Sequence, residues 1–156
     1  MKAQIPEPSL LSRLLMVGFG GIAAMVSFAV SYFLRSAIFY FSSWVADRSE
    51  DFLIGGLILG GMLALGLPIS GGLSGWVGGS VGGFLIQSRW LVQKGWLRGW
   101  VFAWALGGAI IELAWSEDRS YTSLSFETVF GWVGLGIFMG GIFPTLFPPP
   151  PRQPLH

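Results

Sequence analysis

The chain has 156 residues, of which 53% are hydrophobic and 11% are charged, and its mean hydropathy is +0.66. A soluble domain carries about a quarter charged residues, so this composition predicts an integral membrane protein without a separate soluble domain. The net charge of +1 decides nothing by itself, because it averages over the two sides of a membrane. The chain has no basic face, so nucleic-acid binding has no support. The absence of cysteine excludes disulfides and thiolate metal sites, and with His156 as the single histidine we expect no haem or zinc held by imidazole inside the membrane.

The first predicted span is 14–34, an uncharged run that follows Lys2 and Arg13. It is long enough for a transmembrane helix and longer than the apolar core of a signal peptide, so a retained span is expected. The aromatic segment 37–46 is too short to cross a membrane alone. We expect it to be either an interfacial helix or an extension of the first span. Acids within 47–51 favour the start of the next helix there.

The segment 52–87 has no charged residue and holds half of the 24 glycines of the chain. As one helix it would measure about 54 Å, nearly twice the hydrocarbon thickness of a bilayer. Pro68 lies near its middle, followed by residues with turn chemistry. We therefore favour two short helices, 52–67 and 72–87, joined by a tight hairpin. A single kinked and tilted helix is the alternative.

Glycines recur every fourth residue in this segment and again in the last span. Small residues at this spacing let two helix backbones approach closely in a membrane, so glycine-zipper packing is predicted. The partner is either another helix of this chain or a second protein subunit, including a second copy. The predicted helix-packing residues are Gly56, Gly60, Gly71, Gly75, Gly79, Gly83, Gly136 and Gly140.

The densest basic cluster follows in 88–98, where Arg89, Lys94 and Arg98 alternate with Trp90 and Trp96. Basic loops flanked by tryptophan are typical of the cytoplasmic face of a membrane protein. The cluster is either an ordinary positive-inside anchor or a contact for an anionic lipid headgroup or a partner subunit.

The remaining predicted spans are 99–115 and 128–147, and the proline-rich tail 148–156 should be extended. The sequence thus predicts an all-α polytopic membrane bundle with four or five transmembrane helices. The basic loop and the C-terminus are expected on the cytoplasmic side of a plasma (inner) or thylakoid membrane. Counting Lys and Arg does not decide on which side the N-terminus lies.

Glu112 is the one acid inside an apolar span. An ionisable residue in a membrane marks a candidate proton or ion site. Glu112 also lies about one helical turn from the polar segment that begins at Ser116, so contact with headgroups or water is the competing interpretation. No basic partner within the membrane is expected for it.

Three short motifs carry a resemblance to a known class of proteins: residues 87–92 (QSRWLV), 99–101 (GWV) and 105–108 (ALGG). Over about 71–141 the chain resembles glycine- and tryptophan-rich multi-pass modules that are frequent in cyanobacterial membrane proteins. That class has no established activity. The resemblance implies a photosynthetic bacterium and therefore a thylakoid or plasma membrane.

No catalytic constellation is apparent, because the chain lacks a phosphate-binding loop and any Ser–His–acid or Cys–His set. The favoured function is therefore a non-enzymatic accessory or assembly subunit that packs against a larger membrane complex, in a photosynthetic or other energy-converting system. The alternative is a homo-oligomeric channel or small transporter that uses Glu112. Lipids and other membrane subunits are the expected partners, and the sequence leaves any cofactor open.

Overall fold

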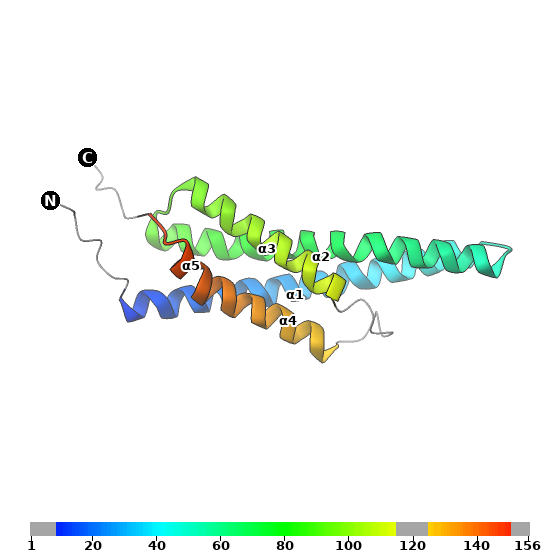
Figure 1. Cartoon of the computed structure of the whole chain (residues 1–156), viewed down its shortest axis with the longest axis horizontal. Coiled ribbons are helices and arrows are strands. Elements are labelled where there is room, and N and C mark those ends of the chain that lie inside the picture. The colour runs from blue at the N-terminus through cyan, green and yellow to red at the C-terminus, as the bar shows by residue number, and fades with distance from the viewer. Residues whose placement is uncertain (1–8, 115–124, 151–156) are drawn as a thin grey trace.

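The computed structural model of the chain describes residues 9–114 and 125–150, and every regular element within these ranges is a helix. Helix α1 (Leu10–Ala46) and helix α2 (Phe52–Trp90) form a long antiparallel hairpin (Figure 1). Helix α3 (Lys94–Ala114) returns along α2. The last helix is continuous from residue 126 to residue 146 and consists of α4 (Phe126–Ile137), the π-helical turn η1 (Phe138–Ile142) and α5 (Phe143–Leu146).

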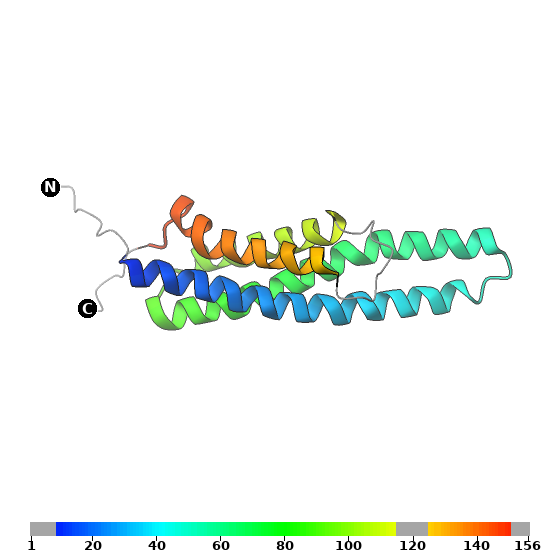
Figure 2. The ribbon, with the colours of Figure 1, turned by 90° about the horizontal axis from the view of Figure 1, so that it is seen from below.

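Four helices are therefore long and apolar enough to cross a membrane. The α1–α2 pair lies at the centre, with α3 packed on α2 and the last helix packed on α1. Figure 2 shows the same arrangement from below, with α1 beginning and α5 ending at one end of the molecule. This even number of spans agrees with the four-helix form of the predicted all-α bundle.

The predicted hairpin at Pro68 is wrong, because α2 runs unbroken through this proline. A proline removes one backbone hydrogen bond from a helix, a loss that membrane helices tolerate where neighbouring helices support them. Here Leu67 and Ser70, on one side of the helix, are buried against neighbouring helices, while Ile69 is exposed. The segment 37–46 likewise extends the first span, since α1 continues to Ala46.

Polar side chains mark where three of the helices begin. The Ser9 side chain accepts a hydrogen bond from the backbone N–H of Ser12, and the Asp51 carboxylate accepts one from that of Leu53. Ser125 caps α4 in the same way. Such N-caps satisfy backbone donors that the first helical turn leaves without partners.

The turn between α2 and α3 contains only residues 91–93, with Leu91 in the left-handed region at φ 50°. The predicted basic loop 88–98 is therefore mostly helical. The predicted span 99–115 begins earlier than expected, at Lys94, and its last residue lies outside the described ranges. Of the predicted extended tail, residues 148–150 are not helical, and 151–156 lie outside the described ranges.

Three tryptophans, Trp100, Trp104 and Trp132, are the largest fully buried side chains. The Trp100 indole donates a hydrogen bond to the carbonyl oxygen of Gly79 at 3.1 Å, and its ring lies 5.8 Å from the ring of Phe143. Aromatic rings therefore join α3 both to α2 and to the last helix.

The helices differ greatly in length. At 1.5 Å per residue α1 and α2 measure about 56 and 58 Å, whereas α3 and the last helix each measure about 32 Å. The two shorter helices cover the end of the hairpin where α1 begins, and the other end projects beyond them (Figures 1 and 2). We call the projecting part, residues 36–46 of α1 and 52–67 of α2, the hairpin extension.

Candidate functional site

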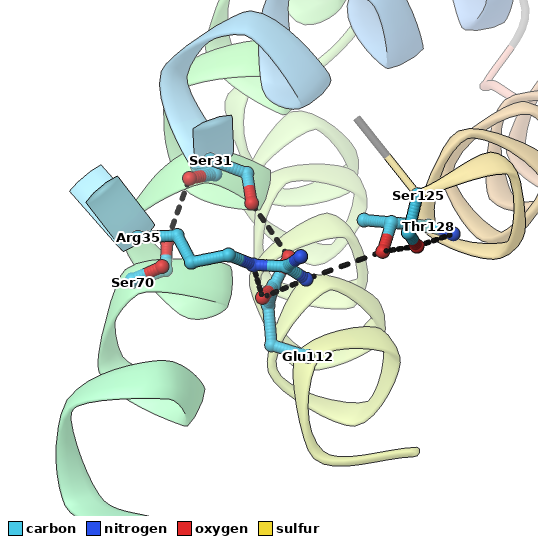
Figure 3. A network of polar contacts seen from close by, with 7 residues as sticks. Ser31, Arg35, Ser70, Glu112, Ser125 and Thr128 are labelled. Carbon is cyan, nitrogen blue, oxygen red and sulfur yellow. Dashed lines mark hydrogen bonds and ion pairs between the residues drawn. The ribbon is translucent and has the colours of Figure 1, made fainter. Parts of the chain in front are cut away.

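The most polar place in the helical bundle is a cluster around Glu112. One carboxylate oxygen, Oε1, accepts a hydrogen bond from the hydroxyl of Ser31 at 2.5 Å. The other, Oε2, accepts from the Nε and Nη2 atoms of Arg35 at 3.0 and 2.8 Å. Arg35 Nη2 also donates to the hydroxyl of Thr128 at 3.2 Å. Figure 3 shows these side chains converging from α1, α3 and the start of α4.

Local helix geometry places each of these groups. Ser31 and Arg35 are four residues apart on α1 and so lie on one face of that helix. Glu112 is in the last turn of α3. Thr128 is in the first turn of α4, where its backbone N–H bonds to the Ser125 side chain at 3.2 Å. The cluster therefore ties three helices together at the level where the hairpin extension begins.

Two glycines make room for Glu112. A Cβ atom on Gly71 would lie 2.6 Å from Glu112 Cγ and would overlap the carbonyl oxygen of Gly108. A Cβ atom on Gly108 would in turn overlap the carbonyl oxygen of Gly71 and lie 2.6 Å from the ring of Trp132. The backbones of α2 and α3 are thus in contact at this point, and this contact brings the Glu112 carboxylate within reach of Arg35.

Burial decides the energetics of the ion pair. Glu112 is 0% exposed and Arg35 is 7% exposed. Removing one member of a buried pair leaves the other charge without compensation, which costs about 3–5 kcal/mol of folding free energy. The intact pair need not stabilise the fold more than apolar side chains of similar size would. The pair thus specifies which helices meet at this level.

The charged groups of the cluster are one acid and one base. Glu112 and Arg35 form one carboxylate–guanidinium pair with two hydroxyls beside it. Among the described residues there is no group of three or more His, Cys, Asp or Glu side chains that could hold a metal ion. The arrangement can join helices and hold a charge in place.

The expectation that Glu112 has no basic partner is wrong, and so is the interpretation that it contacts headgroups or water. Sequence reasoning placed Arg35 between two spans because it assumed that the first helix ends at residue 34. The signal was present in the spacing of Ser27, Ser31 and Arg35 by four residues, and in the apolar segment that follows them. Together they indicate a buried polar stripe on a longer helix.

The predicted helix-packing glycines fall into two groups. Added Cβ atoms on Gly75 and Gly79 would meet Trp104 of α3, and the one on Gly75 would meet its carbonyl oxygen. Added Cβ atoms on Gly136 and Gly140 of the last helix would meet backbone atoms of α1, at Gly20 and Met16 respectively. Gly71 contacts α3 as described above, and a Cβ on Gly83 would have ordinary contacts from 3.6 Å outwards. By contrast, a Cβ on Gly56 or Gly60 would meet nothing within 4 Å.

Further glycines outside the predicted set also lie at close contacts. A Cβ atom on Gly78 would overlap the side-chain oxygen of Ser27, and one on Gly20 would overlap the carbonyl oxygen of Gly136. Gly108 lies against Gly71 as described above. Which neighbour each of these glycines contacts is set by the arrangement of the helices.

The predicted headgroup or partner-contact residues surround the short turn between α2 and α3. Arg89, Lys94 and Arg98 are exposed, and Trp90 and Trp96 are half-buried. The Trp96 indole donates a hydrogen bond to the carbonyl oxygen of Phe147 at 2.7 Å, which fixes the end of the last helix against α3. Trp96 therefore has a contact within the chain, and the three basic side chains are exposed at the surface.

No protein-family model, curated protein or solved structure matches the chain. Function is therefore inferred from the geometry and chemistry of these residues.

Proposed function

We propose that this protein is a non-enzymatic integral membrane subunit that packs against a larger membrane complex through the hairpin extension. The observation that carries the proposal is the length of α1 and α2. The hydrocarbon core of a bilayer is about 30 Å thick, which α3 and the last helix match. Helices of about 56 Å exceed it, and even a 40° tilt would reduce them only to about 43 Å.

The surface of the hairpin extension is unsuited to water. Residues 36–46 and 52–67 contain no charged side chain. Large apolar residues are exposed on both arms, and Phe52 and Leu57 are 93% and 77% exposed. Contiguous apolar patches of this kind on a protein surface mark contacts with proteins or lipid. Because lipid cannot cover the full length, a protein partner is the occupant that fits best.

The outward face of α2 in the extension has the shape that a partner helix requires. Gly56, Gly60 and Ala64 repeat every fourth residue and are exposed. Gly60 and Ala64 lie eleven and seven residues before Gly71, so helical periodicity puts them near the side of α2 that α3 covers further along. The small-residue face of α2 is thus covered by α3 at the bundled end and open in the hairpin extension. We assign the open part of this face to an apolar helix of another subunit.

The charge distribution supports an orientation for this subunit. Among the described residues, Arg13, Arg89, Lys94 and Arg98 lie at the end where α1 begins, and Arg48 lies at the tip of the hairpin. By the positive-inside rule the first end is cytoplasmic, and the extension projects on the opposite side. The resemblance to cyanobacterial modules favours a partner in a photosynthetic or other energy-converting membrane, either thylakoid or plasma membrane.

The channel alternative has less support. A conduction path through Glu112 requires its carboxylate to face water or a mobile ion. Both carboxylate oxygens are instead hydrogen-bonded, one to Ser31 and the other to Arg35, and the side chain is fully buried.

The test is extraction of the tagged protein from its native membrane in a mild detergent, followed by measurement of the native mass and identification of bound proteins. We expect co-migration with a larger complex at fixed stoichiometry. The double variant Gly56→Leu/Gly60→Leu should release the partner by filling the small-residue face. Gly134→Leu is the matched control, because Gly134 also faces open space but lies in the last helix.

Three results would contradict the proposal. If the wild-type protein migrated alone, it would have no partner complex. A pure homo-oligomer would favour the channel alternative. Equal loss of the partner in the control variant would show that the extension is not the contact surface.

A further inference from the structure

A groove of about 420 Å³ runs along the outer side of α2 and α3, away from the Glu112 cluster. Its wall on α2 includes Trp76 and Ser80, and its wall on α3 includes Arg98, Phe102 and Ala105. The groove is shallow and open, so a ligand in it would lie along the surface of the bundle and not be enclosed. The groove is accessible from the side of the bundle, where lipid would surround it.

The groove is polar at one end and apolar at the other. On α3, Phe102 and Ala105 follow Arg98 by four and seven residues, so all three lie near one helical face over about 10 Å. Gly75 of α2 contacts α3 next to Ala105, which places the neighbouring Trp76 towards the apolar end. Ser80 is therefore nearer to Arg98. Arg98 itself lies just over one turn from the start of α3 at Lys94, at the edge of the predicted span.

The charge at the polar end is positive. Arg98 is exposed, and no described acid pairs with it. The segment 82–111 contains Arg89, Lys94 and Arg98 and no acid. An anion at the mouth of the groove would thus meet the guanidinium of Arg98, which no described carboxylate neutralises, in a region where lipid headgroups lie.

We propose that this groove binds an anionic phospholipid, with the headgroup phosphate on Arg98 and one acyl chain along Phe102, Ala105 and Trp76. The apolar part of the groove requires a chain, so a free phosphate would leave it unfilled. A zwitterionic phospholipid offers the same phosphate and chain, but its cationic group neutralises the phosphate, so its net attraction to Arg98 is weaker. The proposal is independent of the partner complex proposed above.

The experiment uses the full chain in nanodiscs that contain equal amounts of phosphatidylglycerol and phosphatidylcholine. The protein is released into detergent, and native mass spectrometry counts the lipids that remain bound. We expect preferential retention of phosphatidylglycerol, and the variant Arg98→Gln should reduce it about fivefold, the factor that corresponds to about 1 kcal/mol for one basic residue near a membrane surface.

Arg13→Gln is the matched control, because Arg13 is an exposed cation at the same end of the molecule but lies on α1, away from the groove. It should leave lipid retention unchanged. A second variant, Ala105→Leu, narrows the apolar part without changing the charge and should also lower retention. Thermal unfolding and helix content of each variant verify that it is folded.

Three results would overturn the proposal. Equal loss in Arg13→Gln and Arg98→Gln would indicate diffuse attraction to the basic end. Unchanged retention in Ala105→Leu would exclude the acyl chain from the groove. Displacement of the lipid by millimolar inorganic phosphate would identify a small-anion site instead.

Discussion

The bundled end of the molecule and the hairpin extension are built from the same two helices but differ in how those helices are covered. At the bundled end α2 lies between α1 and α3, and Gly71 and Gly78 contact neighbouring helices directly. In the extension only α1 accompanies α2, and Gly56 and Gly60 face open space. The same glycine-rich sequence therefore serves close packing at one end and leaves an uncovered face at the other.

The buried ion pair gives the bundled end its strongest expected sensitivity. Glu112→Ala should lower the free energy of unfolding by about 3–5 kcal/mol, because Arg35 remains buried without its counter-charge. Unfolding by titration with a denaturing detergent in micelles measures this loss. The double variant Arg35→Met/Glu112→Leu should recover most of it, and a double variant as unstable as Glu112→Ala would contradict the assignment.

A matched pair of glycine substitutions on α2 compares the two regions directly. Gly71→Ala should cost about 1–3 kcal/mol, because its methyl group overlaps the carbonyl oxygen of Gly108 and crowds Glu112. Gly56→Ala adds the same methyl group in open space and should cause no loss. Thermal unfolding of both variants followed by circular dichroism is the measurement. Equal destabilisation would mean that the two regions do not differ as described.

The smallest expected effect concerns the link to the last helix. Thr128→Val removes the hydrogen bond that Arg35 donates, together with the one between the Thr128 and Ser125 hydroxyls, while retaining the shape of the side chain. Polar contacts between membrane helices contribute about 0.6 kcal/mol on average, so a loss of that order is expected. Ser125→Ala removes the cap of α4 and serves as a comparison. A loss as large as that of Glu112→Ala would show that Thr128 is essential to the ion pair.

Much of the fold was predictable because bilayer crossing imposes strong local rules. A long uncharged run must form helix in lipid to satisfy its backbone, so the all-α class and the three spans outside 52–87 follow from hydropathy. The number of helices in 52–87 was not predictable in this way. Pro68 favours a turn by local rules, but α1 lies alongside both halves of α2 and keeps the helix continuous.

The candidate site was only half predictable. Glu112 is identified by its charge within an apolar span, since such residues are rare in membranes. Its partner Arg35 lies 77 residues earlier, and no local pattern connects two positions so far apart. The same holds for the groove at Arg98, which needs two neighbouring helices to form.

The sequence by itself determined that this chain is helical, that it is apolar enough to cross a membrane four or five times, and that small residues recur at helical spacing. These properties depend on composition and on periodicity along one helix. Only the tertiary structure decided which glycines are covered, that Glu112 pairs with Arg35, and that the α1–α2 hairpin projects beyond its neighbours. Those features depend on which helix lies beside which, and packing between residues distant in sequence sets that arrangement.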